Sequence, residues 1–102
     1  MDIEKLFEQA QKMQEQLSNI GEELAEKIYE GNSGGSEGVT VKMNGRNEML
    51  EVLISDELMT VDNKEMLQDM LLIAFNEAVN KAADDRDEKL GAATAGIKIP
   101  GM

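Results

Sequence analysis

The side chains available for acid–base chemistry in this chain are almost all carboxylates. Its 102 residues include 21 Asp and Glu but no His and no Cys. Imidazole metal sites, His-based triads, thiolate chemistry and disulfides are therefore excluded, and the lack of Cys suits a cytoplasmic protein. The carboxylates form no recognisable catalytic pair. We expect no catalytic residue, no cofactor and no metal ion.

One acidic run, Asp84 to Glu88, superficially suggests a calcium loop. It lacks the glycine at the sixth position and the bidentate glutamate at the twelfth that an EF-hand requires. Helical spacing instead predicts surface ion pairs from Glu77 to Lys81 and from Asp85 to Lys89, each contributing a few tenths of a kcal/mol.

The segment from Gly31 to Gly38 is rich in glycine and serine. A phosphate-binding loop needs Gly-Lys-Ser/Thr at the start of a helix, and here a strand pattern follows. The segment is predicted to be a flexible connection between two β segments. Lys27 to Glu30, just before it, fits either the end of a helix or a short strand.

The charge balance is strongly acidic, with a net charge of -11. Residues 1–31 hold 8 acids and 3 bases, and residues 56–90 hold 10 acids and 4 bases. This argues against a broadly cationic binder of nucleic acid or membrane surfaces. The longest apolar run, Met70 to Phe75, is far too short to span a bilayer, and the charged N-terminus resembles no signal peptide.

The elements that position these side chains are organised around a predicted β-hairpin from Gly38 to Ser55. Alternating apolar residues indicate a strand with one buried face, and Asn44-Gly45 predicts a two-residue type I′ turn. That turn would place Val39 opposite Leu50. The buried face of this hairpin then comprises Val39, Val41, Met43, Leu50, Val52 and Ile54.

A first helix is predicted from a heptad seam that runs from Ile3 to Leu24 with alternating spacings of 3 and 4. Glu8 and Lys12 form a favourable pair on its exposed side. A helix of this length needs a partner, so we infer a homodimer. The predicted dimer contacts on both helices are Leu6, Met13, Leu17, Met70, Leu71 and Phe75.

A second helix is predicted from about residue 63 to about residue 90, with Asp62 as its N-cap and Gly91 at its end. Leu72 and Ile73 make its middle apolar nearly all round, which implies burial on more than one side. Residues 1–90 are thus predicted to form one domain, and residues 91–102 a loosely ordered tail.

This order of elements resembles the YbaB/EbfC family of bacterial nucleoid-associated proteins. The resemblance covers essentially the whole chain and is most specific at three places: the Asn44-Gly45 hairpin, the block Lys64–Asp69 and the segment Ala74–Ala78. It implies an α+β fold with a long N-terminal helix, a three-stranded antiparallel sheet whose first strand includes Lys27–Glu30, and a long C-terminal helix.

The same resemblance implies a tweezer-like homodimer that binds double-stranded DNA through its helices, at the nucleoid in the cytoplasm. Family members often carry basic residues where this chain has Leu50-Glu51 and Asn80-Lys81. Binding is therefore expected to be weak. It is also expected to be indifferent to sequence, because no helix-turn-helix or zinc-finger spacing presents side chains to base edges. The cations that the helices offer are Lys5, Lys12, Lys81, Arg86 and Lys89.

The acidic composition also fits a second hypothesis. In it the chain is a protein-interaction module that docks DNA repair or replication proteins and does not itself bind DNA. Binding to duplex DNA at low salt discriminates between the two, because only the first predicts a complex.

Overall fold

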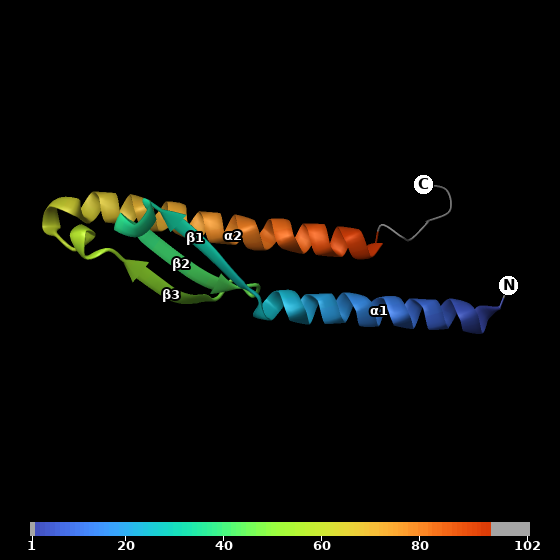
Figure 1. The fold of residues 1–102 in the computed structure, drawn as a ribbon. Coiled ribbons are helices and arrows are strands. Elements are labelled where there is room, and N and C mark those ends of the chain that lie inside the picture. The colour runs from blue at the N-terminus through green and yellow to red at the C-terminus, as the bar shows by residue number, and fades with distance from the viewer. Residues whose placement is uncertain (1, 95–102) are drawn as a thin grey trace.

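The computed structural model describes residues 2–94. Helix α1 (Ile3–Glu26) leads into strand β1 (Ile28–Ser33), followed by β2 (Val39–Asn44), β3 (Met49–Ile54) and helix α2 (Lys64–Thr94). Short 3₁₀ turns cover Gly35–Glu37, Asp56–Leu58 and Val61–Asn63. The three strands form one antiparallel sheet in the order β1-β2-β3 (Figure 1). The predicted α+β architecture is confirmed.

The start of β1 settles the alternative left open for Lys27–Glu30. Asp2 caps α1 by accepting a hydrogen bond from the Glu4 amide at 3.1 Å, and Lys27 ends the helix in an extended conformation. Strand β1 then pairs with the whole of β2, from Ile28 opposite Asn44 to Ser33 opposite Val39.

The hairpin between β2 and β3 differs from the predicted two-residue turn. Val39 pairs with Ile54 rather than Leu50, and the ladder is irregular at Lys42/Met43 because β3 has one extra residue there. The Asn44 side chain closes a longer loop, since its Oδ1 accepts hydrogen bonds from the amides of Arg46 and Glu48 at 2.9 and 3.1 Å. Asn47, with φ of 63°, takes the left-handed conformation.

Gly45 serves a different purpose from the one its sequence context suggests. A Cβ at this position would overlap the Leu24 carbonyl at the end of α1, and the Gly45 amide donates to Ala25 O at 3.2 Å. Gly45 is therefore required because α1 and the hairpin loop approach each other closely.

Helix α2 is longer than predicted at its C-terminal end. It begins at Lys64, after a 3₁₀ turn that contains the expected cap Asp62, and it continues through Gly91 to Thr94. One glycine inside a helix costs only about 1 kcal/mol, so the alanines that follow Gly91 can sustain the helix. Residues 91–94 of the predicted tail are thus helical, and its remainder lies outside the described residues.

The core lies between α2 and one face of the sheet. Val39, Val41 and Met43 are fully buried there, as predicted. Small residues let the backbones approach, because a Cβ on Gly31 of β1 would overlap the Ala74 carbonyl of α2. The helix presents a row of buried alanines at four-residue spacing, Ala74, Ala78 and Ala82.

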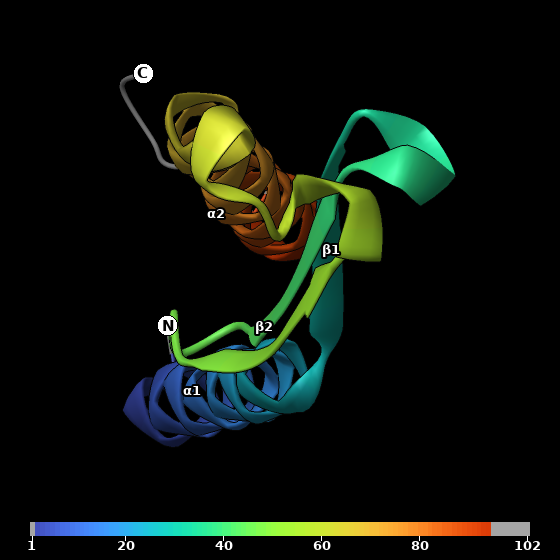
Figure 2. The ribbon, with the colours of Figure 1, turned by 90° about the vertical axis from the view of Figure 1, so that its left-hand side faces the viewer.

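The molecule is long and thin, with extents of 71 × 25 × 16 Å and a radius of gyration of 20.1 Å. A compact domain of this length has a radius of gyration near 13 Å. Both helices extend from the sheet in the same direction, and α1 reaches beyond the end of α2 (Figure 1). Figure 2 shows α2 against one face of the sheet. No helix within residues 2–94 is both long and apolar enough to cross a membrane.

Candidate nucleic-acid interface

The accessible cations of α1 lie on one polar stripe. Lys5 and Lys12 are exposed and form no ion pair within residues 2–94, so the expected pair of Lys12 with Glu8 is absent. Spacings of 4, 3, 4 and 3 place both on one face of the helix with exposed amide side chains. We call this face the α1 polar stripe: Lys5, Gln9, Lys12, Gln16 and Asn19.

The α1 polar stripe faces α2 at its inner end. Gln16, Asn19 and Ile20 of α1 line one side of an open hollow of about 570 Å³, and Lys89, Ala92 and Ala93 of α2 line the other. Lys89 thus lies across the hollow from the inner end of the stripe.

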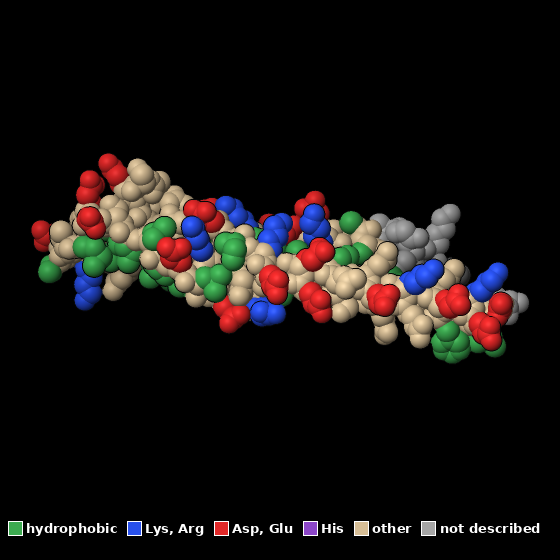
Figure 3. Space-filling model, turned by 60° about the horizontal axis from the view of Figure 1, so that its bottom comes forward, with side chains coloured by type: hydrophobic (Ala, Val, Ile, Leu, Met, Phe, Trp, Pro, Cys, Tyr) green, Lys and Arg blue, Asp and Glu red, His purple; other side chains and the backbone are tan. Residues whose placement is uncertain are grey.

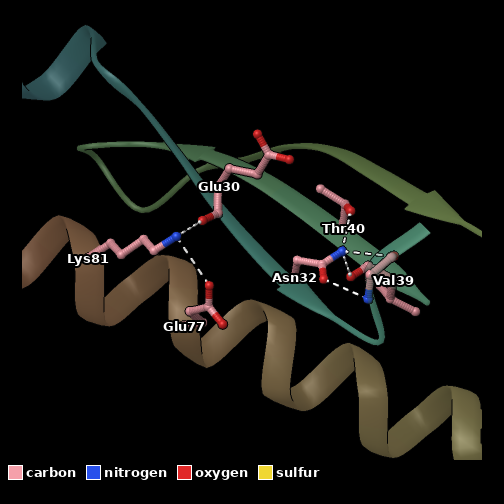
Figure 4. A network of polar contacts seen from close by, with 7 residues as sticks. Glu30, Asn32, Val39, Thr40, Glu77 and Lys81 are labelled. Atoms are coloured by element: carbon pink, nitrogen blue, oxygen red, sulfur yellow. Dashed lines mark hydrogen bonds and ion pairs between the residues drawn. The ribbon is translucent and has the colours of Figure 1, made fainter. Parts of the chain in front are cut away.

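The other two predicted DNA contacts on α2 are engaged within the chain. Lys81 Nζ donates to the Glu30 carbonyl at 2.8 Å and forms the predicted ion pair with Glu77 at 3.1 Å (Figure 4). Arg86 donates to the Gly45 carbonyl at 3.4 Å. Both side chains tie α2 to other elements, and each keeps further N–H donors that these partners do not use.

The glycine-rich segment is more ordered than predicted, because the Asn32 side chain holds it. Its Oδ1 accepts from the Gly35 amide at 2.9 Å, and its Nδ2 donates to Thr40 Oγ1 at 2.8 Å and to Val39 O at 3.2 Å (Figure 4). The first residues of the segment belong to β1, and a 3₁₀ turn follows at Gly35–Glu37. No phosphate-binding loop is formed there.

A polar junction joins α1, β1 and α2. Asp85 Oδ2 accepts hydrogen bonds of 2.7 Å from Lys27 Nζ and from the Tyr29 hydroxyl, and Lys27 Nζ lies 5.6 Å from the centre of the Tyr29 ring. Asp85 therefore forms its ion pair with Lys27. Helical spacing had predicted Lys89 as the partner instead. Local sequence patterns could not predict this junction, because Tyr29 and Lys27 lie 56 and 58 positions away from Asp85 in the sequence.

The junction shifts the pKa values of its two acidic groups, Tyr29 and Asp85, in opposite directions. Burial, together with the hydrogen bond and negative charge of Asp85, raises the pKa of Tyr29 to about 12. The hydrogen bonds from Lys27 and Tyr29 lower the pKa of Asp85 below its ordinary value. The ionised carboxylate and the neutral phenol are therefore the stable pair.

Strand β3 carries an apolar surface that the sequence reading assigned to the core. All six of its residues are exposed, and within residues 2–94 it pairs only with β2, which leaves its other edge unpaired there. Met49, Val52 and Ile54 pair with the buried Met43, Val41 and Val39, yet they remain 44, 37 and 36% exposed. Leu50, the extra residue of the ladder, is 54% exposed rather than buried as predicted. On α2, Leu72 and Ile73 are also more than half exposed. The burial predicted for them does not occur within one chain.

The predicted dimer contacts fall into two groups. On α1, Leu6 is 49% exposed, whereas Met13 and Leu17 are half-buried. On α2, Met70, Leu71 and Phe75 are half-buried and pack on the core cluster of Val39, Val41, Leu58 and Ala74. Figure 3 shows apolar side chains over the sheet and at the free end of α1, with acidic and basic side chains interspersed between them.

Comparison with known proteins gives consistent matches over nearly the full length. Residues 1–97 match the model of the YbaB/EbfC DNA-binding family. A nucleoid-associated protein of Desulfotalea psychrophila is 41% identical over 102 residues, which cover 100% of this chain and 95% of that relative. A nucleoid-associated protein of Chloroflexus aurantiacus is 44% identical over 98 residues, covering 96% and 97% of the two chains.

The fold also matches a solved structure. The crystal structure of an uncharacterized protein from Helicobacter pylori superposes with a TM-score of 0.73 at 28% sequence identity. The match covers 94% of this chain and 99% of the other.

Proposed function

This chain belongs to the YbaB/EbfC DNA-binding family, and from that premise we propose that it acts as a homodimer that binds duplex DNA weakly and without sequence preference, and has no enzymatic activity. The single observation that carries the proposal is the family match over residues 1–97. Two bacterial relatives are named nucleoid-associated proteins, which supports a role at the nucleoid.

The uncovered apolar surface of β3 and α2 supports the dimer. Helix α2 crosses β1 and β2 but leaves β3 bare, with five large apolar residues between 36 and 54% exposed. A free apolar edge strand invites pairing with another chain. A second copy would cover Met49, Val52 and Ile54 on one face of β3, whereas Leu53 lies on the opposite face. Leu72 and Ile73 add exposed apolar area on α2.

The α1 polar stripe, with Lys89 opposite it, supports the DNA contact. Cations that neutralise phosphates supply most of non-specific DNA affinity. Lys5 and Lys12 are free to do so, and the amide groups between them can donate hydrogen bonds to phosphate oxygens. Glu8 and Glu15 neighbour Lys5 and Lys12 at three- and four-residue spacing, so they partly cancel the positive field of the stripe, and binding is expected only at low salt.

A mobility-shift titration with two charge-matched double variants tests this assignment. Lys5→Gln with Lys12→Gln removes two positive charges from the α1 polar stripe. Gln11→Glu with Gln14→Glu makes the same change in net charge on another exposed face of α1. At low salt we expect the first variant to lose roughly tenfold or more in affinity and to show a shallower salt dependence. The second should lose much less.

Each other result contradicts a specific part of the proposal. Equal losses in the two variants would mean that DNA senses only the overall field, and no loss in either would place the contact elsewhere. If the wild-type protein ignores duplex DNA even at low salt, the DNA-binding proposal fails. The acidic protein-interaction module then becomes the better account.

A further inference from the structure

The loop between β2 and β3 contains the one Asn-Gly pair of the chain, Asn44-Gly45. Such a pair is prone to deamidation, because glycine has no side chain to shield its amide nitrogen. In this reaction the Gly45 nitrogen loses its proton and attacks Cγ of Asn44. A bond forms between Cγ and that nitrogen, the bond from Cγ to Nδ2 breaks, and Nδ2 leaves with the proton as ammonia. Water then opens the resulting cyclic imide to aspartate or isoaspartate.

The amide group that would react is held in place in the folded chain. Asn44 is 8% exposed, and its Nδ2 donates to Glu48 Oε1 at 3.0 Å. Its Oδ1 accepts from the amides of Arg46 and Glu48 at 2.9 and 3.1 Å. Cγ can become tetrahedral and release Nδ2 only after the side chain leaves these partners.

The nitrogen that would attack is held by both helices. The Gly45 amide donates to Ala25 O of α1 at 3.2 Å, and Gly45 O accepts from Arg86 of α2 at 3.4 Å. The α1 backbone is so close that a Cβ on Gly45 would overlap the Leu24 carbonyl. A base can therefore take the Gly45 proton only after the end of α1 separates from the loop.

We propose that Asn44-Gly45 is a latent deamidation site controlled by α1: it stays intact while α1 contacts the loop and reacts when that contact opens. The product does not rebuild the loop, because a carboxylate at residue 44 has no N–H to donate to Glu48 and repels its charge. Isoaspartate also inserts its Cβ into the backbone. Deamidation thus makes a reversible opening of α1 permanent. This inference is independent of DNA binding.

Peptide mapping by mass spectrometry of the full chain, incubated at mildly alkaline pH, measures the deamidation rate at residue 44. We expect the folded wild-type protein to react slower than the urea-unfolded chain by roughly tenfold or more. Leu24→Ala, which removes a buried side chain at the end of α1, should raise the rate in the folded protein severalfold. The matched control is Ile3→Ala, which removes the same number of atoms from a 66% exposed position of α1 and should leave the rate unchanged. Circular dichroism verifies that both variants are folded.

Two outcomes overturn the control by α1. Equal rates in the folded and unfolded wild-type chain would show that the fold gives no protection, and this comparison needs no variant to fold. A folded Leu24→Ala protein that reacts as slowly as wild type would show that the end of α1 does not control the site.

The effect of the product is tested by Asn44→Asp, which we expect to lower the urea midpoint of unfolding. Its matched control is Asn47→Asp, the same change at an exposed residue of the same loop, which should keep the wild-type midpoint. Equal midpoints in the two variants would show that a carboxylate at residue 44 rebuilds the loop, which contradicts the permanent opening.

Discussion

At the scale of single residues, one polar junction brings together side chains that are distant in the sequence. Asp85 of α2 accepts hydrogen bonds from Lys27, at the C-terminal end of α1, and from Tyr29 of β1. These two bonds join the three elements. Tyr29 is the only tyrosine and the chain has no tryptophan, so its ionisation can be followed by ultraviolet absorbance without interference.

We predict that Tyr29 titrates near pH 12, because burial and the neighbouring Asp85 both disfavour the phenolate. A pKa raised on folding contributes stability that is fully present below pH 10, the ordinary value, and is lost as the pH rises through 12. Replacing Asp85→Asn should move the titration part of the way back toward pH 10. A Tyr29→Phe variant should lose this alkaline dependence in urea unfolding. A wild-type midpoint near 10 would contradict the assignment.

At the scale of elements, the contact between α2 and the sheet depends on residues without bulk. Gly31 on β1 lies directly against the backbone of Ala74 and Ala78, where any side chain would overlap. This close approach buries Val39, Val41 and Met43 beneath the helix. The close packing of β1 against α2 therefore depends on the absence of a side chain at Gly31.

We predict that Gly31→Ala destabilises the protein by about 1–3 kcal/mol, because β1 and α2 must separate to admit the methyl group. The matched control is Gly21→Ala in α1, where a Cβ meets no atom within 4 Å. Alanine there should raise stability by about 0.5–1 kcal/mol, since it favours the helix. Chemical denaturation measures both changes. A neutral Gly31→Ala would show that the two elements are not in close contact.

At the scale of the whole molecule, one chain is too thin to cover its own apolar surface. Its shortest extent is 16 Å, and β3 lacks the helix that covers β1 and β2. The negative charge is spread along the length of the molecule, so electrostatics opposes association and apolar contact must drive it.

We predict that wild-type protein sediments at twice the monomer mass at micromolar concentration, and that Val52→Glu on β3 converts it to a monomer. The control is Val61→Glu, the same substitution at a residue 89% exposed in the turn before α2, which should leave the dimer intact. Exposed substitutions change the stability of a single chain by less than about 0.5 kcal/mol, so loss of mass without loss of helix would report the interface. A Val52→Glu protein that remains dimeric would exclude β3 from it.

The sequence by itself determined the elements and their order, because each depends on local periodicity. The heptad seam of α1, the alternation of Val39, Val41 and Met43, and the long apolar pattern of α2 correspond to the observed helices and strand. The resemblance to a family supplied β1, which periodicity left undecided.

Tertiary structure decided what local patterns cannot encode. The hairpin register changed because Asn44 closes a longer loop and Gly45 is needed against Leu24. Lys81 and Arg86 donate to carbonyl groups 51 and 41 residues away, which local patterns do not predict. Burial is a property of neighbours rather than of sequence position, so only the folded chain reveals that no other strand of residues 2–94 pairs with the outer edge of β3.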